Sequence, residues 1–174
     1  MKFNMKSQLI IVVLILSLTN LAFSSDQSKN LVEVYYDWCL ENDIQIDEIL
    51  KNGTDDDAIP IINTLGLIWK HRDGEIWIGV APRISSAFLY KPRLMFLWFS
   101  KHEKEYSSWL KEMPTALFTA WSGENSDVVR LEKLRVKMIE NLKIYQKSES
   151  NEDLRQNCLA LIEVLQKTKV DKIQ

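Results

Sequence analysis

Histidine, cysteine and glycine are scarce in this chain of 174 residues, which has two histidines, two cysteines and five glycines. The two histidines, His71 and His102, cannot form a zinc-protease helix, because the sequence HEKEY at 102–106 lacks the second imidazole one turn away. The letters HRD at 71–73 match a kinase catalytic loop in three positions only. We therefore place both histidines in surface turns.

Other signatures of chemistry are also missing. The sequence has no glycine-rich loop that would cradle a phosphate and no nucleophile elbow. Three adjacent acids in TDDD at 54–57 lack the alternating ligands and the glycine of a calcium loop, so we interpret them as helix-capping residues. We predict no metal site and no cofactor.

The two cysteines, Cys39 and Cys158, lie near opposite ends of the chain and form no C-x-x-C motif, which argues against a thioredoxin-like redox enzyme. A single well-separated pair in an exported protein favours a disulfide, and closing so long a loop would stabilise the fold by about 3–5 kcal/mol. The alternative is two buried thiols that pack as small apolar groups.

Residues 1–24 have the layout of a secretory signal peptide: two lysines and no acid, an apolar run at 9–16, and small residues at Ala22 and Ser24. The apolar segment at 9–23 is shorter than a membrane span and is interrupted by polar residues, so we expect no membrane anchor after cleavage. We predict a periplasmic or extracellular protein with one domain at 25–174. Removing two lysines and no acid changes the net charge from −2 to −4, which argues against nucleic-acid binding.

Apolar residues recur at helical spacing from residue 31 to residue 165. The first stripe contains Leu31, Val32, Tyr35, Trp38 and Cys39. A short helical turn follows at 46–50. The next helix is expected to be capped by Asp57.

Asp73-Gly74 in the stretch IWKHRDGEIWIGV raises two alternatives, a two-residue hairpin and a turn between helices. The apolar positions from Ile76 to Phe88 keep a helical spacing for more than three turns, which favours the turn between helices. Pro82 leaves two possibilities: the helix bends there, or it begins there after an irregular segment at 75–81.

Later helices are predicted from Pro92, from Glu105 to Met113 with an end at Pro114, from an Asp127 cap, and over 154–165. The sequence thus predicts an all-α domain of six or seven helices in antiparallel pairs, either a compact bundle or a short HEAT-like array. A disulfide between the first and last helices would close it.

Two segments are candidate partner-binding surfaces. The first is the apolar stretch 88–99, which contains Trp98 and is flanked by Arg83, Lys91 and Arg93; the alternative is that it forms the central buried helix. The second is the loop region 117–126, where Trp121 stands beside a glycine.

We predict that the protein binds another macromolecule, as an inhibitor, immunity factor, adaptor or assembly subunit, and has no catalysis of its own. One alternative is a carrier of an apolar small molecule or lipid, with a cavity lined by Phe88, Trp98, Phe99 and Trp109. A further alternative is a hydrolase that uses two carboxylates. The partner is predicted to be a protein whose identity the sequence does not give.

Overall fold

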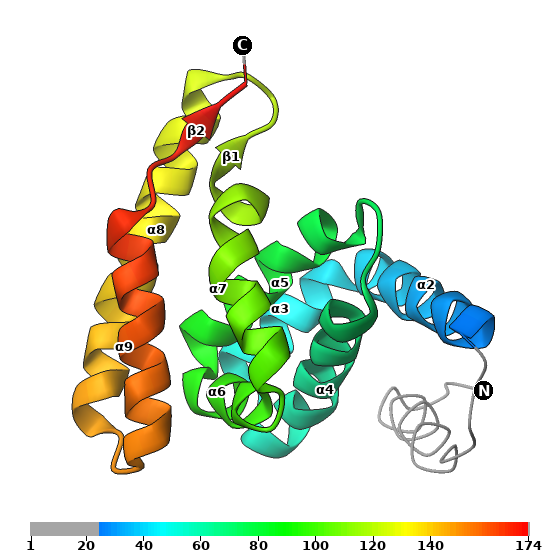
Figure 1. Ribbon diagram of the computed structural model, residues 1–174, viewed down its shortest axis with the longest axis horizontal. Coiled ribbons are helices and arrows are strands. Elements are labelled where there is room, and N and C mark those ends of the chain that lie inside the picture. Colours follow the sequence, from blue (N-terminus) through cyan, green and yellow to red (C-terminus); the bar gives the residue numbers. More distant parts are fainter. Residues whose placement is uncertain (1–24, 174) are drawn as a thin grey trace.

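The computed structural model describes residues 25–173, with side chains from residue 31 onward, and the predicted signal peptide at 1–24 lies outside the described residues. The described chain is almost entirely helical (Figure 1). In chain order its elements are α2 (Ser25–Glu41), α3 (Asp43–Asn52), α4 (Asp55–His71), α5 (Ile76–Tyr90), α6 (Pro92–Ser100), α7 (Glu103–Phe118), β1 (Thr119–Ala120), α8 (Asn125–Ser148), α9 (Glu152–Lys167) and β2 (Asp171–Lys172).

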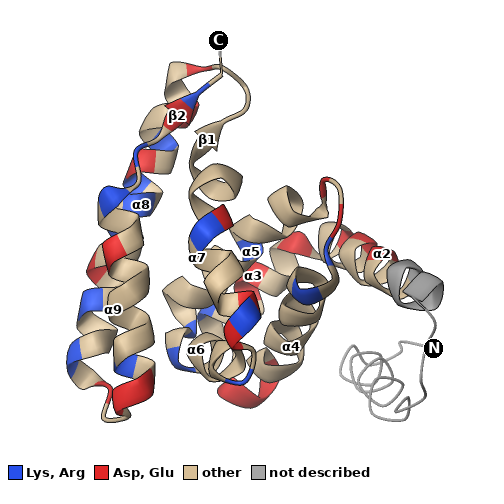
Figure 2. Ribbon diagram, viewed as in Figure 1, with Lys and Arg blue, Asp and Glu red and all other residues tan. Residues whose placement is uncertain are grey.

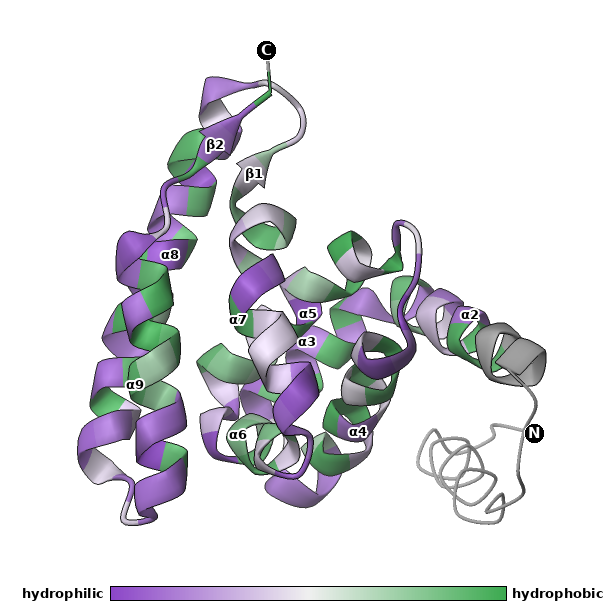
Figure 3. Ribbon diagram, in the orientation of Figure 1, coloured by the Kyte–Doolittle hydropathy of each residue, from purple (hydrophilic) through white to green (hydrophobic). Residues whose placement is uncertain are grey.

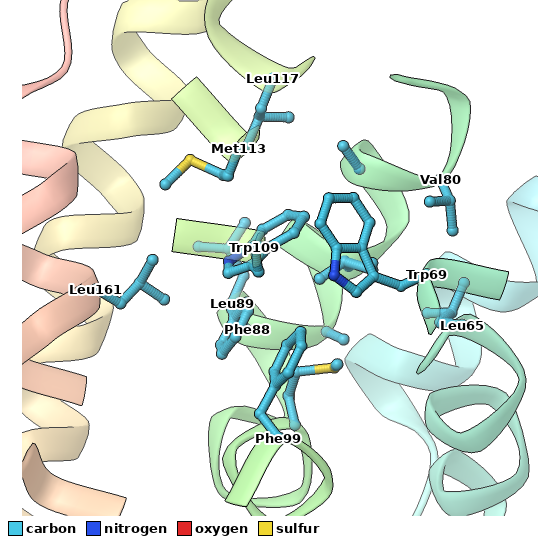
Figure 4. Close-up of a cluster of buried hydrophobic side chains, with 14 of the residues drawn as sticks. Leu65, Trp69, Val80, Phe88, Leu89, Phe99, Trp109, Met113, Leu117 and Leu161 are labelled. Atoms are coloured by element: carbon cyan, nitrogen blue, oxygen red, sulfur yellow. The ribbon is translucent and has the colours of Figure 1, made fainter. Parts of the chain in front are cut away.

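Helix α5 lies at the centre of the body and contacts α3, α4, α6, α7 and α8. Around it, an aromatic core is formed by Trp69, Phe88, Phe99 and Trp109, all fully buried (Figure 4). The rings of Trp69 and Trp109 meet edge to face, with their centroids 5.1 Å apart. The prediction of an all-α fold is confirmed, and the helices that surround α5 make a compact body.

The turn at Asp73-Gly74 joins α4 to α5, so the prediction of a turn between helices is confirmed. Gly74 has a φ of +48°, a left-handed conformation that a glycine adopts without strain. Pro82 lies inside α5, so the alternative in which the helix begins at Pro82 is wrong. The helix tolerates the lost backbone hydrogen bond because Val80, Ala81 and Ile84 are all fully buried around this point.

Three expected helix ends differ from the structure. Thr54, rather than Asp57, caps α4. The Thr54 hydroxyl oxygen accepts a hydrogen bond from the Asp57 amide, and the Asp57 carboxylate accepts one from the Thr54 amide, which makes a reciprocal capping box. Helix α7 continues through Pro114 to Phe118, because Met113 and the residues after Pro114 are buried in the core. Helix α8 starts at Asn125, so Asp127 lies in its first turn, where it accepts a hydrogen bond from Ser122.

One element was not predicted at all. This element is a small parallel sheet, in which both residues of β2 pair with β1: Thr119 lies opposite Asp171 and Ala120 opposite Lys172. The pairing holds the end of the chain beside the start of α8, where the Lys172 ammonium donates to the Asn125 side chain at 2.9 Å.

The predicted disulfide is wrong, because Cys39 and Cys158 are both free and buried. Helix α2 makes its main contacts with α4, whereas α9 packs on α6, α7 and α8, so the two helices lie on different sides of the body (Figure 1). Burial raises the pKa of the Cys39 thiol to about 11 and that of the Cys158 thiol to about 12. The Cys158 thiol donates to the Leu142 carbonyl at 3.3 Å.

Candidate interaction surface

The apolar segment 88–99 is mainly core. Phe88, Phe96 and Phe99 are fully buried, and Trp98 is 8% exposed. The Trp98 ring stacks on His102 with centroids 4.0 Å apart and covers Gly66 so closely that a Cβ there would be 2.1 Å from a ring carbon. The structure therefore places Trp98 in contact with its own chain.

The three cations that flank this segment each contact a different element. Arg83 pairs with Asp43 of α3 at 2.8 Å, and its side chain is 11% exposed. The Lys91 ammonium donates to the Gly53 carbonyl at 2.7 Å, between α3 and α4. Arg93 is 62% exposed and lies 3.5 Å from the buried carboxylate of Glu149.

The carboxylate of Glu149 is buried and is held by hydrogen bonds. It accepts hydrogen bonds from the Asn151 amide at 2.8 Å and from the Tyr145 hydroxyl at 2.7 Å. These bonds, and the charge of Arg93 after them, lower the pKa of Glu149. Arg93 thus stabilises the corner between α8 and α9, whether or not it also contacts a partner.

Trp121 is the predicted partner-binding residue whose aromatic side chain is exposed, at 49%. It lies in the turn between β1 and α8, which is closed by a hydrogen bond from the Gly123 amide to the Ala120 carbonyl at 3.0 Å. Gly123 has a φ of +71° and approaches the Ile173 carbonyl. The role of Trp121 in binding stays a prediction.

The rings expected to line a carrier cavity pack against one another instead. Phe88 stacks on Phe99 with centroids 5.8 Å apart, and Trp109 lies 5.9 Å from Phe88. Trp98 meets Phe99 edge to face at 5.2 Å. The four rings fill the space between them.

An open pocket of about 370 Å³ lies between α3 and α5. Its wall is formed by Asp43, Ile44, Ile46, Asp47, Glu48, Lys51, Pro82, Arg83 and Ser86. Three carboxylates and two cations in so small an opening suit a charged group better than an apolar ligand.

Helix α2 presents an uncovered apolar face that we did not identify from the sequence. Val32 is buried, whereas Leu31 and Val34 are 40% and 61% exposed, and Tyr35 and Trp38 are half-buried. At 100° per residue, the apolar residues from Val34 round to the buried Val32 cover an arc of about 160°. Since α4 covers only part of that arc, the rest faces outward. Figure 3 shows hydrophobic positions along α2.

A row of acids borders this apolar face. Glu33, Asp37 and Glu41 are spaced four residues apart on α2, and all three are exposed. Figure 2 shows acidic positions along α2 and α3. We define the α2 face as Leu31, Val34, Tyr35 and Trp38 together with Glu33, Asp37 and Glu41. The signal available in the sequence was the width of the apolar arc.

The chain matches no protein-family model, and no curated protein or solved structure is significantly similar to it. Within residues 25–173, no cluster of three or more histidine, cysteine or acidic side chains is arranged to hold a metal ion. No helix in that range is both long enough and apolar enough to cross a bilayer.

Proposed function

We propose that this protein is exported and acts by binding another protein, with the α2 face as its docking surface. The observation that carries the proposal is the outward-facing apolar arc of α2. Val34, at 61% exposed, and Leu31, at 40%, lie on consecutive turns beside the half-buried Trp38. Full burial of one such aliphatic side chain stabilises an assembly by about 1.5–3 kcal/mol, so a partner that covers this face gains binding energy.

The charges around the arc indicate the chemistry of the partner. Glu33, Asp37 and Glu41 form a row one turn apart. Complementary charge at the rim of an interface accelerates association and disfavours wrong partners. The partner surface that fits is therefore a helix with an apolar stripe bordered by lysine or arginine, lying alongside α2.

Three carboxyl groups have a pKa that favours their charged form. They are Asp127, Glu132 and Glu149, and each has a pKa below its ordinary value. In each case a hydrogen bond to the charged form is the main cause. A general acid in a glycosidase requires the opposite shift.

A position-specific crosslink tests the proposal. A photoreactive amino acid placed at Val34 is expected to give one discrete crosslinked product in cells that export the protein. The same group at Ile59, which is 42% exposed on α4, is the matched control. Asp37→Lys should reduce the Val34 product by reversing one rim charge. Equal or absent products at the two positions would contradict a docking role for α2.

A further inference from the structure

A second exposed face lies on α8, and its charge is opposite to that of the α2 face. The exposed residues between 129 and 147 are three aliphatic residues, five basic residues and one acid. They are Val129, Arg130, Lys133, Val136, Lys137, Glu140, Lys143, Ile144 and Lys147. At 100° per residue all nine fall within an arc of about 140°, and we call this set the α8 face.

The positive charge of the α8 face is largely uncompensated within the chain. Among residues 31–173, Lys133, Lys143 and Lys147 make no ion pair. Arg130 pairs with Asp127 at 3.2 Å, and the Lys137 ammonium lies 5.4 Å from the Tyr90 ring. A concentrated positive strip on a chain of net charge −2 favours an anionic partner surface.

The exposed aliphatic residues make this strip suitable for an interface as well as for counterions. Val129, Val136 and Ile144 are 54%, 41% and 69% exposed, and they lie among the lysines. From Val129 to Ile144 these side chains extend over about 23 Å of α8, at 1.5 Å per residue. A facing helix with its own apolar stripe would bury all three.

We propose that the partner of the α2 face is the α8 face of a second copy of this chain; this inference rests on the proposed function. Each face supplies what the other requires. The α2 face has an apolar stripe beside acids at 33, 37 and 41, and the α8 face has aliphatic residues beside bases at 130, 133 and 137. Both rows repeat every three to four residues, so helices packed side by side would bring opposite charges together.

The charge pattern also selects the symmetry of the assembly. A two-fold contact through a single face would place α2 against α2, acid facing acid, or α8 against α8, base facing base, and both arrangements are disfavoured by repulsion. A two-fold contact that paired α2 with α8 twice would need both faces on one side of the body. Figure 2 shows the two helices on different sides of the body, so they do not meet within one chain. The contact is therefore head to tail, and a pair joined in this way leaves the α8 face of one copy and the α2 face of the other free.

Sedimentation velocity of the protein purified in its exported form tests the inference. The average mass is expected to rise between about 1 µM and 1 mM, the range of weak specific contacts. Ionic strength should reverse the effect, because the screening length falls from about 30 Å at 0.01 M salt to about 3 Å at 1 M. A protein that stays monomeric throughout this range at low salt would overturn the proposal.

Two charge-reversal variants make the test specific. Glu33→Lys/Asp37→Lys gives a chain with two basic faces. Lys133→Glu/Lys137→Glu gives a chain whose α2 face is acidic and whose α8 face has acids at the two reversed positions. Each variant alone should bind itself about tenfold more weakly than the wild type. Their equimolar mixture should regain association, since every α2–α8 contact between unlike variants is again complementary. The matched control Asp153→Lys, on the exposed start of α9, should self-associate like the wild type.

The remaining outcomes separate this inference from the proposed function. A Val34 crosslink to residues 129–147 of the same sequence supports both. A Val34 crosslink to a different protein, with no self-association, overturns the second-copy assignment and leaves the docking role of α2 standing. Binding of the monomeric protein to vesicles of phosphatidylglycerol, abolished by Lys133→Glu/Lys137→Glu, would assign the α8 face to an anionic lipid surface and would also overturn the second-copy assignment.

Discussion

Replacing Gly66 by alanine should destabilise the protein, although alanine is the better helix former. Gly66 is buried in α4 under the Trp98 indole. An added Cβ would lie 2.1, 2.4 and 2.6 Å from three ring carbons. Ordinary contact begins at about 3.4–4 Å, so the ring or the helix must shift by more than an ångström.

The ring has little freedom to move away. Trp98 is stacked on His102 at 4.0 Å and meets the buried Phe99 edge to face at 5.2 Å. Overpacking of this kind costs about 1–3 kcal/mol, and a clash with a confined indole belongs at or above the upper end. The higher helix propensity of alanine raises the free energy of unfolding by about 1 kcal/mol. The net loss expected is about 2 kcal/mol, or about 4–8 °C in Tm for a domain of this size.

Urea unfolding followed by tryptophan fluorescence or circular dichroism measures this loss. The double variant Gly66→Ala/Trp98→Leu removes the ring that clashes. It should therefore be about 1–2 kcal/mol more stable than the sum of the two single effects. A Gly66→Ala protein as stable as the wild type, or double-variant effects that simply add, would refute the packing argument.

Three further predictions concern other buried groups. Glu149→Gln should lower the free energy of unfolding at pH 7. The folded-state pKa of Glu149 is below its ordinary value of 4.5, so the contribution of its charged form to the free energy of unfolding is present above that pH and is lost as the pH falls through the folded pKa. The difference in the free energy of unfolding between the variant and the wild type should therefore shrink below about pH 4.5. Urea midpoints across pH 3–7 measure this difference. Tyr106→Phe removes the hydroxyl that donates to the Asn157 carbonyl and should cost about 0.5–1.5 kcal/mol in urea unfolding, an argument that an unchanged midpoint would contradict. The unfolded, unreduced chain should take up two alkylating groups per molecule, at Cys39 and Cys158, and the folded chain should react much more slowly; an intact mass with no added groups in the unfolded sample would show that the thiols are paired.

Helix periodicity carried most of the fold prediction. The apolar spacing from Ile76 to Phe88, together with Asp73-Gly74, was enough to identify two helices joined by a turn, and Pro92 correctly marked the start of α6. Two positions at which proline was considered as a helix boundary lie inside helices: Pro114, where we predicted an end, and Pro82, where a start was one of two alternatives. At Pro82 and Pro114 the missing hydrogen bond is outweighed by burial of the neighbouring residues, which local sequence does not reveal.

The candidate site was harder to predict because exposure depends on which helices become neighbours. Cys39 and Cys158 could form a disulfide only if α2 and α9 touched, and that order of packing is not encoded in periodicity. For the same reason Trp98, which we predicted to bind a partner, is covered by α4, whereas Val34, which is not part of the predicted first stripe, is left uncovered. The sequence gives the width of an apolar arc but not the part of it that a neighbour covers.

The pairing of β1 with β2 also sets the order in which a newly made chain becomes complete. A ribosome that adds about 5–20 residues per second releases Asp171 and Lys172 roughly 3–10 s after Thr119 and Ala120. During that interval the β1 edge has no strand beside it, while α8 and α9 can already form from local contacts. Removal of residues 170–174 would leave the β1 edge permanently without its partner strand.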